Sequence, residues 1–195
     1  MTRGYTVGMV DDSQADRREA LKRVAVALKR SEIPYALIGG YAVWARGGPE
    51  SENDVDFMVA AEDAKEAANS LVEQGFEVRH PPEDWLFKVD TDGTTVDVIF
   101  RDSGSPAERS AVEASGVLEV LSVLMPVLPA TQLMVQKLNA LDEHMCDFAN
   151  LLSVARALRE QVDWDQVRQQ TGHNDFAAAF LYLLERLDIV DRPTA

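Results

Sequence analysis

The sequence predicts an α+β protein in which a mixed sheet flanked by helices is followed by a helical C-terminal half. Two observations predict this class. As far as residue 101, segments with the period of an amphipathic helix alternate with short β-type segments, whereas beyond Pro129 only helical periods occur. The chain has 195 residues, 46% of them hydrophobic, which is enough for one domain or for two small ones that share a core. We expect an α/β unit with an N-terminal helix at 1–105 and a helical unit at 106–195.

The first expected elements are a helix and a strand that ends at two glycines. A helix is predicted over 13–30, where apolar residues recur at the spacing of one helix face. The apolar run 35–38 precedes the two glycines and is typical of a buried strand. A short helix is expected over 41–46. Residues 54–60 then alternate between apolar and mostly acidic positions, which indicates a strand with one buried face.

The next expected elements are a helix, a strand and a hairpin. The helix is predicted over 62–74 and the strand over 76–79. Two further strands, over 85–89 and 95–101, are separated by an Asp-Gly pair, which tight hairpin turns prefer. We therefore expect these two strands to pair in an antiparallel arrangement.

Helical periods fill the C-terminal half of the chain. They cover 130–141, 147–160, 164–169 and 176–187. The boundary between the two halves is expected between Ser103 and Pro129. The longest apolar region, 117–129, is interrupted by polar residues and a proline and falls short of the roughly 20 residues that a membrane span needs. No membrane is therefore expected among the partners.

Charge and cysteine content exclude several classes of protein. The chain has 33 acidic and 19 basic residues and a net charge of −14, which argues against a protein that coats a nucleic acid. The single cysteine, Cys146, excludes a disulfide framework and a Cys-rich zinc site. The first residues lack the apolar stretch of a signal peptide, so we expect a cytoplasmic protein. The helix at 13–30 is locally basic, and this face either contacts RNA, meets an acidic partner or is an ordinary solvated surface.

Glycines and carboxylates follow one another in a pattern that indicates phosphate chemistry. Asp54 and Asp56 are separated by one residue on a predicted strand, so both project from one face and can hold a hard cation such as Mg²⁺. Gly39 and Gly40 end a strand just before a helix, where backbone N–H groups can approach an anion closely. Asp97 lies on a later strand among apolar neighbours, where its charge is unfavourable unless something binds it.

In this order, the residues at about 35–100 resemble the DNA polymerase β-like nucleotidyltransferase superfamily. The superfamily pattern is an apolar residue, a Gly-Gly or Gly-Ser pair, a gap of this length, an acidic-apolar-acidic triplet and a third acid on a later strand. The resemblance implies a nucleotidyltransferase-fold sheet with two metal ions, expected to be Mg²⁺, that bridge an NTP and an attacking hydroxyl. It assigns metal binding and catalysis to Asp54, Asp56 and Asp97. The residues it places at the nucleotide are Gly39, Gly40 and Tyr41.

The C-terminal half adds a second resemblance. Segments 133–141 and 147–152 are similar to the Lys-Leu-x-Ala-Leu and Asp-x-x-Asp-Leu segments of the AbiEii-type toxin nucleotidyltransferases, which include the MenT proteins. In that group the lysine matched by Lys137 contacts the triphosphate, and the aspartate matched by Asp147 completes the site. Several members modify the 3′ end of tRNA and many have an antitoxin, so the resemblance implies a tRNA acceptor and an antitoxin partner.

The predicted function is metal-dependent transfer of NMP from an NTP to a hydroxyl acceptor, with release of pyrophosphate. The tRNA 3′ end is one expected acceptor, and a small molecule of the aminoglycoside kind is the second, because cationic aminoglycosides favour carboxylate-lined clefts. The third alternative is a degenerate nucleotide-binding module without activity. Two assignments also have structural alternatives: Asp147 could cap a helix, and Lys137 could extend its ammonium group from the core into water.

Overall fold

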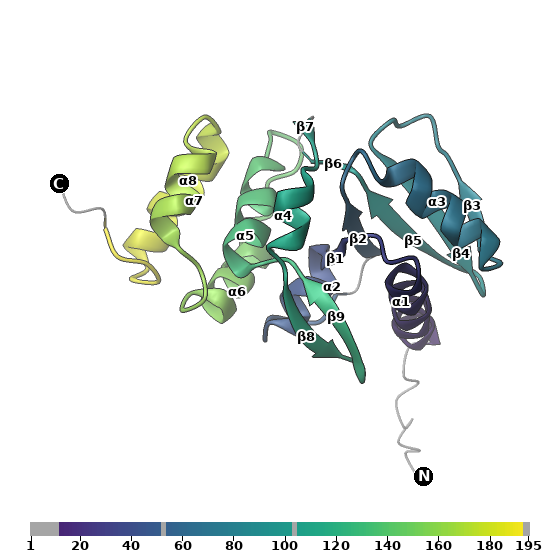
Figure 1. Cartoon of the computed structure of the whole chain (residues 1–195). Helices are drawn as coiled ribbons and strands as arrows, with labels where there is room; N and C mark the ends of the chain where they lie inside the picture. Colours follow the sequence, from purple (N-terminus) through teal and green to yellow (C-terminus); the bar gives the residue numbers. More distant parts are fainter. Residues whose placement is uncertain (1–11, 52–53, 103–104, 193–195) are drawn as a thin grey trace, which may run out of the picture.

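A mixed sheet of seven strands organises the structure (Figure 1), which is a computed structural model that describes residues 12–51, 54–102 and 105–192. The strand order is β3-β4-β5-β2-β1-β9-β8. Pairs β2–β5 and β1–β9 are parallel, and the other pairs are antiparallel. The strands of the sheet are β1 (Tyr35–Ile38), β2 (Val55–Val59), β3 (Glu77–Arg79), β4 (Leu86–Thr91), β5 (Thr94–Ile99), β8 (Gly116–Val120) and β9 (Val123–Val127).

Helices flank the sheet and form the C-terminal part of the described chain. Those that precede the last two strands are α1 (Asp12–Arg30), α2 (Gly39–Ala45), α3 (Ala64–Glu73) and α4 (Arg109–Glu113). Those that follow are α5 (Ala130–Asn139), α6 (Phe148–Leu158), α7 (Trp164–Thr171) and α8 (Asp175–Arg186). Strands β6 (Arg101–Asp102) and β7 (Ser105–Pro106) form a separate two-stranded ladder. In Figure 1, α7 and α8 lie at one end of the molecule, and α3, β3 and β4 lie at the other.

The predicted fold class is confirmed. Each helix and strand expected between 13 and 101, and each helix expected after Pro129, has an observed counterpart whose ends differ by a few residues. The expected hairpin is β4–β5, and its turn residues Asp92 and Gly93 both have positive φ. The N-terminal stretch that bears on a signal peptide, and Ser103 at the expected boundary, lie outside the described residues.

Strands β8 and β9 were not expected from the sequence. They lie beyond residue 105, within the stretch assigned to a helical unit, yet β9 pairs with β1 and extends the sheet. Their connection is a turn at Leu121 and Ser122, both with positive φ. Neither residue belongs to the Gly, Asn and Asp types that usually mark such turns. The purely helical part of the chain therefore begins at α5.

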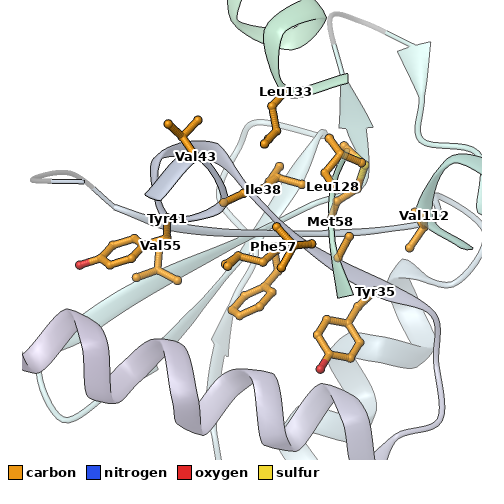
Figure 2. Packing of buried hydrophobic residues seen from close by; sticks show 14 of the residues in the cluster. Tyr35, Ile38, Tyr41, Val43, Val55, Phe57, Met58, Val112, Leu128 and Leu133 are labelled. Carbon is orange, nitrogen blue, oxygen red and sulfur yellow. The ribbon is translucent and has the colours of Figure 1, made fainter. Parts of the chain in front are cut away.

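The two faces of the sheet have different roles. On one face Tyr35, Val55 and Phe57 point toward α1, and the rings of Tyr35 and Phe57 are in edge contact at 5.9 Å between centroids (Figure 2). Period-two alternation places the side chains of Asp56 on β2 and Asp97 on β5 on the opposite face. The buried face therefore supplies the core and leaves the other face available for a site.

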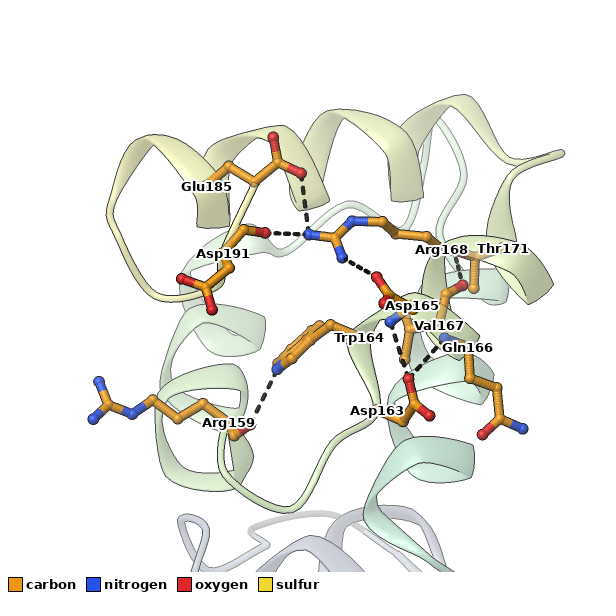
Figure 3. A network of polar contacts seen from close by, with 10 residues as sticks. All are labelled: Arg159, Asp163, Trp164, Asp165, Gln166, Val167, Arg168, Thr171, Glu185 and Asp191. Atoms are coloured by element: carbon orange, nitrogen blue, oxygen red, sulfur yellow. Dashed lines mark hydrogen bonds and ion pairs between the residues drawn. The ribbon is translucent and has the colours of Figure 1, made fainter. Parts of the chain in front are cut away.

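The C-terminal helices are fastened by polar contacts. Arg168 of α7 donates to Asp165, to Glu185 of α8 and to the carbonyl of Asp191 (Figure 3). Asn174 accepts from the first N–H groups of α8 and donates to backbone carbonyls at the end of α5. Because α5 also contacts α2, these bonds connect the helical part to the sheet. Within the described residues, no helix is both long and apolar enough to cross a bilayer.

Candidate active site

Two predicted metal ligands are direct neighbours across adjacent strands. Strands β2 and β5 run parallel in a register that pairs Asp56 with Asp97. Asp54 comes immediately before β2 and is exposed, whereas Asp56 is mostly buried. The register follows from the sequence, because the apolar residues on both strands must face the same core. The arrangement places the carboxylates of Asp56 and Asp97 side by side on adjacent strands, with Asp54 just before β2.

The charge of Asp56 is unfavourable in its surroundings. Burial, together with the nearby charges of Asp97 and Asp54, raises the pKa of Asp56 to about 7. Lys137 and Lys88 act in the opposite direction but only partly compensate. A buried carboxylate among other carboxylates is therefore poised to receive a cation, which would relieve the repulsion.

Asp97 has a cation beside it in the form of Lys88. The hairpin register places Lys88 of β4 opposite Asp97 of β5, and its Nζ contacts Oδ1 at 2.8 Å and Oδ2 at 3.0 Å. The side chains are 30% and 13% exposed, respectively. Lys88 is a site residue that the sequence reasoning missed, although the register implied by the Asp92-Gly93 turn would have placed it there.

The two glycines are required by close packing against site residues. Gly39 has φ of +65°, and a Cβ there would collide with Oδ2 of Asp56. A Cβ on Gly40 would collide with Oγ of Ser51. The diglycine thus lets the chain pass directly beside the acidic strand, and any side chain would displace Asp56 or Ser51.

Lys137 and Asp147 approach the same place from the helical part. Lys137 is on α5, where burial lowers its pKa while the charge of Asp56 raises it. Asp147 is the N-cap of α6 and accepts from the backbone N–H of Asn150 at 3.0 Å. The capping alternative for Asp147 is therefore observed, and the residue still lines the cavity described next.

A cavity of about 550 Å³ collects most of the predicted residues. Its lining includes Gly39, Gly40, Asp54, Asp56, Lys137 and Asp147. The side chain of Tyr41 is not brought there: it is fully buried in the core and makes an edge contact with Trp44 at 6.1 Å. The Asp97 side chain points to Lys88 and is not part of the lining.

Further cavity residues come from the segment before Asp54 and from α6. Glu50 is held by Arg18 of α1 through two hydrogen bonds of 2.7 and 2.6 Å. Asn150 and Ser153 line the cavity from α6. The helical spacing of Asp147, Asn150 and Ser153 is the signal that would have indicated a shared face.

The carboxylates fit a hard divalent cation by their chemistry. Oxygen donors from Asp54 and Asp56 suit Mg²⁺, and a bound cation would oppose the burial and charge repulsion that raise the pKa of Asp56. Among the described residues no three Asp, Glu, His or Cys side chains are converged on one point. The reason is visible at Asp97, whose two oxygens are engaged by Lys88. Asp54 and Asp56 are thus the residues that would hold a first ion.

Comparison with known proteins is informative at the level of structure. No family model and no curated protein matches the chain. The antibiotic-resistance factor ANT(2″)-Ia, in a solution structure, superposes with a TM-score of 0.58 at 13% identity, covering 89% of this chain and 98% of that chain. A crystal structure of ANT(2″)-Ia in complex with adenylyl-2″-tobramycin gives 0.57 at 14% identity, covering 86% and 98%.

A third similar structure is an antigenic nucleotidyltransferase-like protein from Paracoccidioides brasiliensis, with a TM-score of 0.52 at 12% identity and 89% of each chain covered. These similarities extend over both the sheet and the helical part. The chain therefore has the nucleotidyltransferase fold that the sequence predicts.

Proposed function

We propose that this protein transfers NMP from an NTP to a hydroxyl acceptor and releases pyrophosphate. The observation that carries the proposal is the 550 Å³ cavity, which gathers Gly39, Gly40, Asp54, Asp56, Lys137 and Asp147 from elements far apart in the chain. Separately, each motif is a weak signal, whereas their meeting at one cavity on a nucleotidyltransferase fold is specific.

The residues have complementary roles in this reaction. Lys137 offers a positive charge for the triphosphate, and Gly39 and Gly40 allow its close approach. Asp54 and Asp56 are the residues that would hold Mg²⁺, with two ions implied by the sequence resemblance. When bound, Mg²⁺ supplies Lewis-acid stabilisation of the transferring phosphoryl group. The sequence resemblance gives Asp97, the cross-strand neighbour of Asp56, the role of accepting the proton of the acceptor hydroxyl, which requires Lys88 to release its oxygens.

A small molecule is the acceptor that the charges favour over the tRNA 3′ end. The basic helix α1, considered above as an RNA-contacting face, uses three of its cations internally: Arg18 on Glu50, Lys22 on Glu19 and Arg23 on Asp92. The chain as a whole carries a net charge of −14, which opposes binding to a phosphate backbone. The tRNA acceptor and the antitoxin partner rest on the AbiEii resemblance and stay predictions.

A transfer assay tests the proposal. The protein is incubated with each α-labelled NTP, Mg²⁺ and either total tRNA or a panel of hydroxyl-bearing amines that includes aminoglycosides. Label in a small molecule supports the favoured acceptor, and label in RNA supports the tRNA reading. NTP binding without transfer to any acceptor supports the degenerate module.

The assay includes two variants. Asp56→Asn should abolish transfer while the protein stays folded, and activity equal to wild type would contradict the assignment of the site. Glu160→Gln serves as the matched control, because Glu160 is 82% exposed, pairs with Arg159 and lines neither the 550 Å³ cavity nor its neighbour.

A further inference from the structure

A second and larger cavity adjoins the first. It has a volume of about 750 Å³ and shares Gly39, Asp56 and Lys137 with the 550 Å³ cavity. This volume lies within the range of small-molecule sites, roughly 300 to 1,000 Å³. Two cavities that meet at Asp56 are suited to two reactants that meet there. The larger one has the composition described next.

The floor of the larger cavity is an apolar surface of the sheet that adjoins Asp56 and Asp97. Met58 of β2 and Ile99 of β5 are paired in the same register as Asp56 and Asp97, two residues further along. Side chains two apart on a strand share a face, about 6 to 7 Å from one another. A molecule lying on Met58 and Ile99 therefore has one end at the carboxylates.

An aromatic side chain stands at the wall of this cavity. Trp85 is 42% exposed, which is unusual for an indole that has no function on the surface. Its backbone is fixed, since its carbonyl accepts from the N–H groups of Phe100 at 3.0 Å and Arg101 at 3.3 Å. Leu133 of α5 contributes apolar surface to the same cavity. The apolar surface suits a ring with a hydrophobic face.

The part of the cavity lined by the end of α5 is rich in hydrogen-bond acceptors. Asp142 accepts from the backbone N–H groups of His144 at 2.7 Å and Met145 at 2.8 Å, and these bonds lower the pKa of its carboxyl group. The Oδ1 atom of Asn139 is buried and has no partner among the described residues. Asn139 is the last residue of α5 and Asp142 follows shortly after it, at the helix end where the dipole favours a positive charge.

The other charges at the cavity are already opposed. Arg101 donates to Asp84 at 3.2 Å, and the charge of Lys137 acts on Asp56. His173 also lines the cavity. Asp142 is therefore the carboxylate in this lining without an opposing Arg or Lys among the described residues.

We propose that this cavity is the acceptor site, and that it takes a compact hydroxyl compound with an apolar ring face and one protonated amine. The inference rests on the proposed function. The amine lies against Asp142, the ring lies on Met58, Ile99 and Trp85, and the hydroxyl reaches Asp56, the lining residue that is paired with Asp97 across the two strands. The hydroxyl oxygen bonds to the α-phosphorus, the α–β bridging P–O bond breaks with its electron pair leaving on pyrophosphate, and the hydroxyl proton passes to Asp97 after Lys88 has released its carboxylate oxygens.

A binding experiment with matched probes tests the inference on the full chain. Tyramine carries a ring, a hydroxyl and an amine, and N-acetyltyramine lacks only the cation. Both are titrated by protein-observed NMR, in parallel with ATP and Mg²⁺. Tyramine should bind about fivefold more tightly than N-acetyltyramine, as expected for one partly exposed charge pair.

Variants locate the effect. Asp142→Asn retains the oxygen that accepts from His144 and Met145 but removes the charge, so the preference for tyramine should fall to about twofold or less. Trp85→Ala should weaken both probes and leave ATP binding unchanged. Glu160→Gln removes a distant exposed charge and should behave as wild type.

The outcomes separate this inference from the proposed function. Equal binding of the two probes, an unchanged preference in Asp142→Asn, or binding of neither probe while ATP binds would each overturn the acceptor class. Tighter binding of kanamycin or of a tRNA acceptor-stem RNA than of tyramine would overturn it as well. If the wild-type protein does not bind ATP but still binds tyramine more tightly than N-acetyltyramine, the result would count against the proposed function but not against the inferred acceptor cavity.

Discussion

Asp56 lies where the sheet, the diglycine and α5 come together, and its surroundings oppose its negative charge. Burial and two neighbouring carboxylates raise its pKa to about 7, far above the ordinary value of 3.8. The ionised form of Asp56 therefore weakens the folded state. The conflict is resolved if a cation binds there.

The raised pKa of Asp56 predicts how stability depends on pH without metal. Because the folded state holds the proton more tightly than the unfolded state, the free energy of unfolding should fall as pH rises from about 4 to about 7. Urea unfolding in EDTA at pH 5 and pH 8 measures this. The fall should be about 2 to 3 kcal/mol larger in wild type than in Asp56→Asn. Identical pH profiles would contradict the assigned burial.

Gly39 is predicted to be intolerant of any side chain. Gly39→Ala combines a positive φ with a collision against Asp56, so it should destabilise the fold by about 1 to 3 kcal/mol and lower transfer at least about tenfold. Gly116→Ala is the control, because a Cβ at Gly116 meets nothing within 4 Å. Thermal unfolding and the transfer assay measure both variants, and equal behaviour would disprove the tight packing.

The ammonium group of Lys88 is predicted to neutralise Asp97 in the absence of a metal ion. Lys88→Met should lower the free energy of unfolding in EDTA by about 1 kcal/mol, and Mg²⁺ should restore more stability than it gives wild type. Lys22→Met, which removes a pair with Glu19 on α1, should show no such Mg²⁺ response. If Mg²⁺ does not change the free energy of unfolding of Lys88→Met, then Asp97 is not part of the metal site.

Much of the candidate site could be predicted from the sequence because its residues follow local rules. The alternation around Asp56 and the diglycine before a helix are visible in a single chain. The role of Lys88 required knowledge of the hairpin register. The burial of Tyr41 depends on how α2 packs against β2, which no local pattern specifies.

At the level of elements, β8 and β9 are strands that the local sequence pattern did not predict. Their residues are apolar, but the turn between them uses Leu121 and Ser122 at positive φ instead of glycine or asparagine. Pairing with β1 stabilises this turn, and that pairing joins Leu37 to Val127, which are far apart in the chain. Elements that are defined by long-range pairing were therefore missed, while helices defined by their own periodicity were found.

Asn174 is predicted to stabilise the helical part through two functions. Its Oδ1 caps α8, and its Nδ2 donates to the carbonyls of Leu138 at 3.2 Å and Leu141 at 2.9 Å. Asn174→Asp keeps the cap but places a carboxylate against carbonyl oxygens. It should lower the free energy of unfolding by about 1 to 3 kcal/mol, measured by urea denaturation at pH 7. A neutral effect would mean that the cap alone matters.

At the scale of the whole molecule, the net negative charge and the two adjoining cavities both favour a small second reactant over a nucleic acid. Arg18, Lys22 and Arg23 of α1 are paired with carboxylates, which reduces the positive charge that this helix offers to a nucleic acid, whereas the adjoining cavities at Asp56 suit the proposed NTP and a small second reactant. Helix α5 lines both cavities and contacts the other C-terminal helices, so it couples the helical part to the chemistry.

The central claim is that Asp54 and Asp56 bind a nucleotide through a divalent cation. The most direct measurement is the affinity for each of the NTPs with Mg²⁺ and with EDTA, in wild type and in Asp54→Asn/Asp56→Asn. Mg²⁺ should strengthen NTP binding to wild type at least about tenfold and leave NTP binding to the double variant unchanged. An equal Mg²⁺ response in both proteins, or no NTP binding to wild type, would contradict the claim.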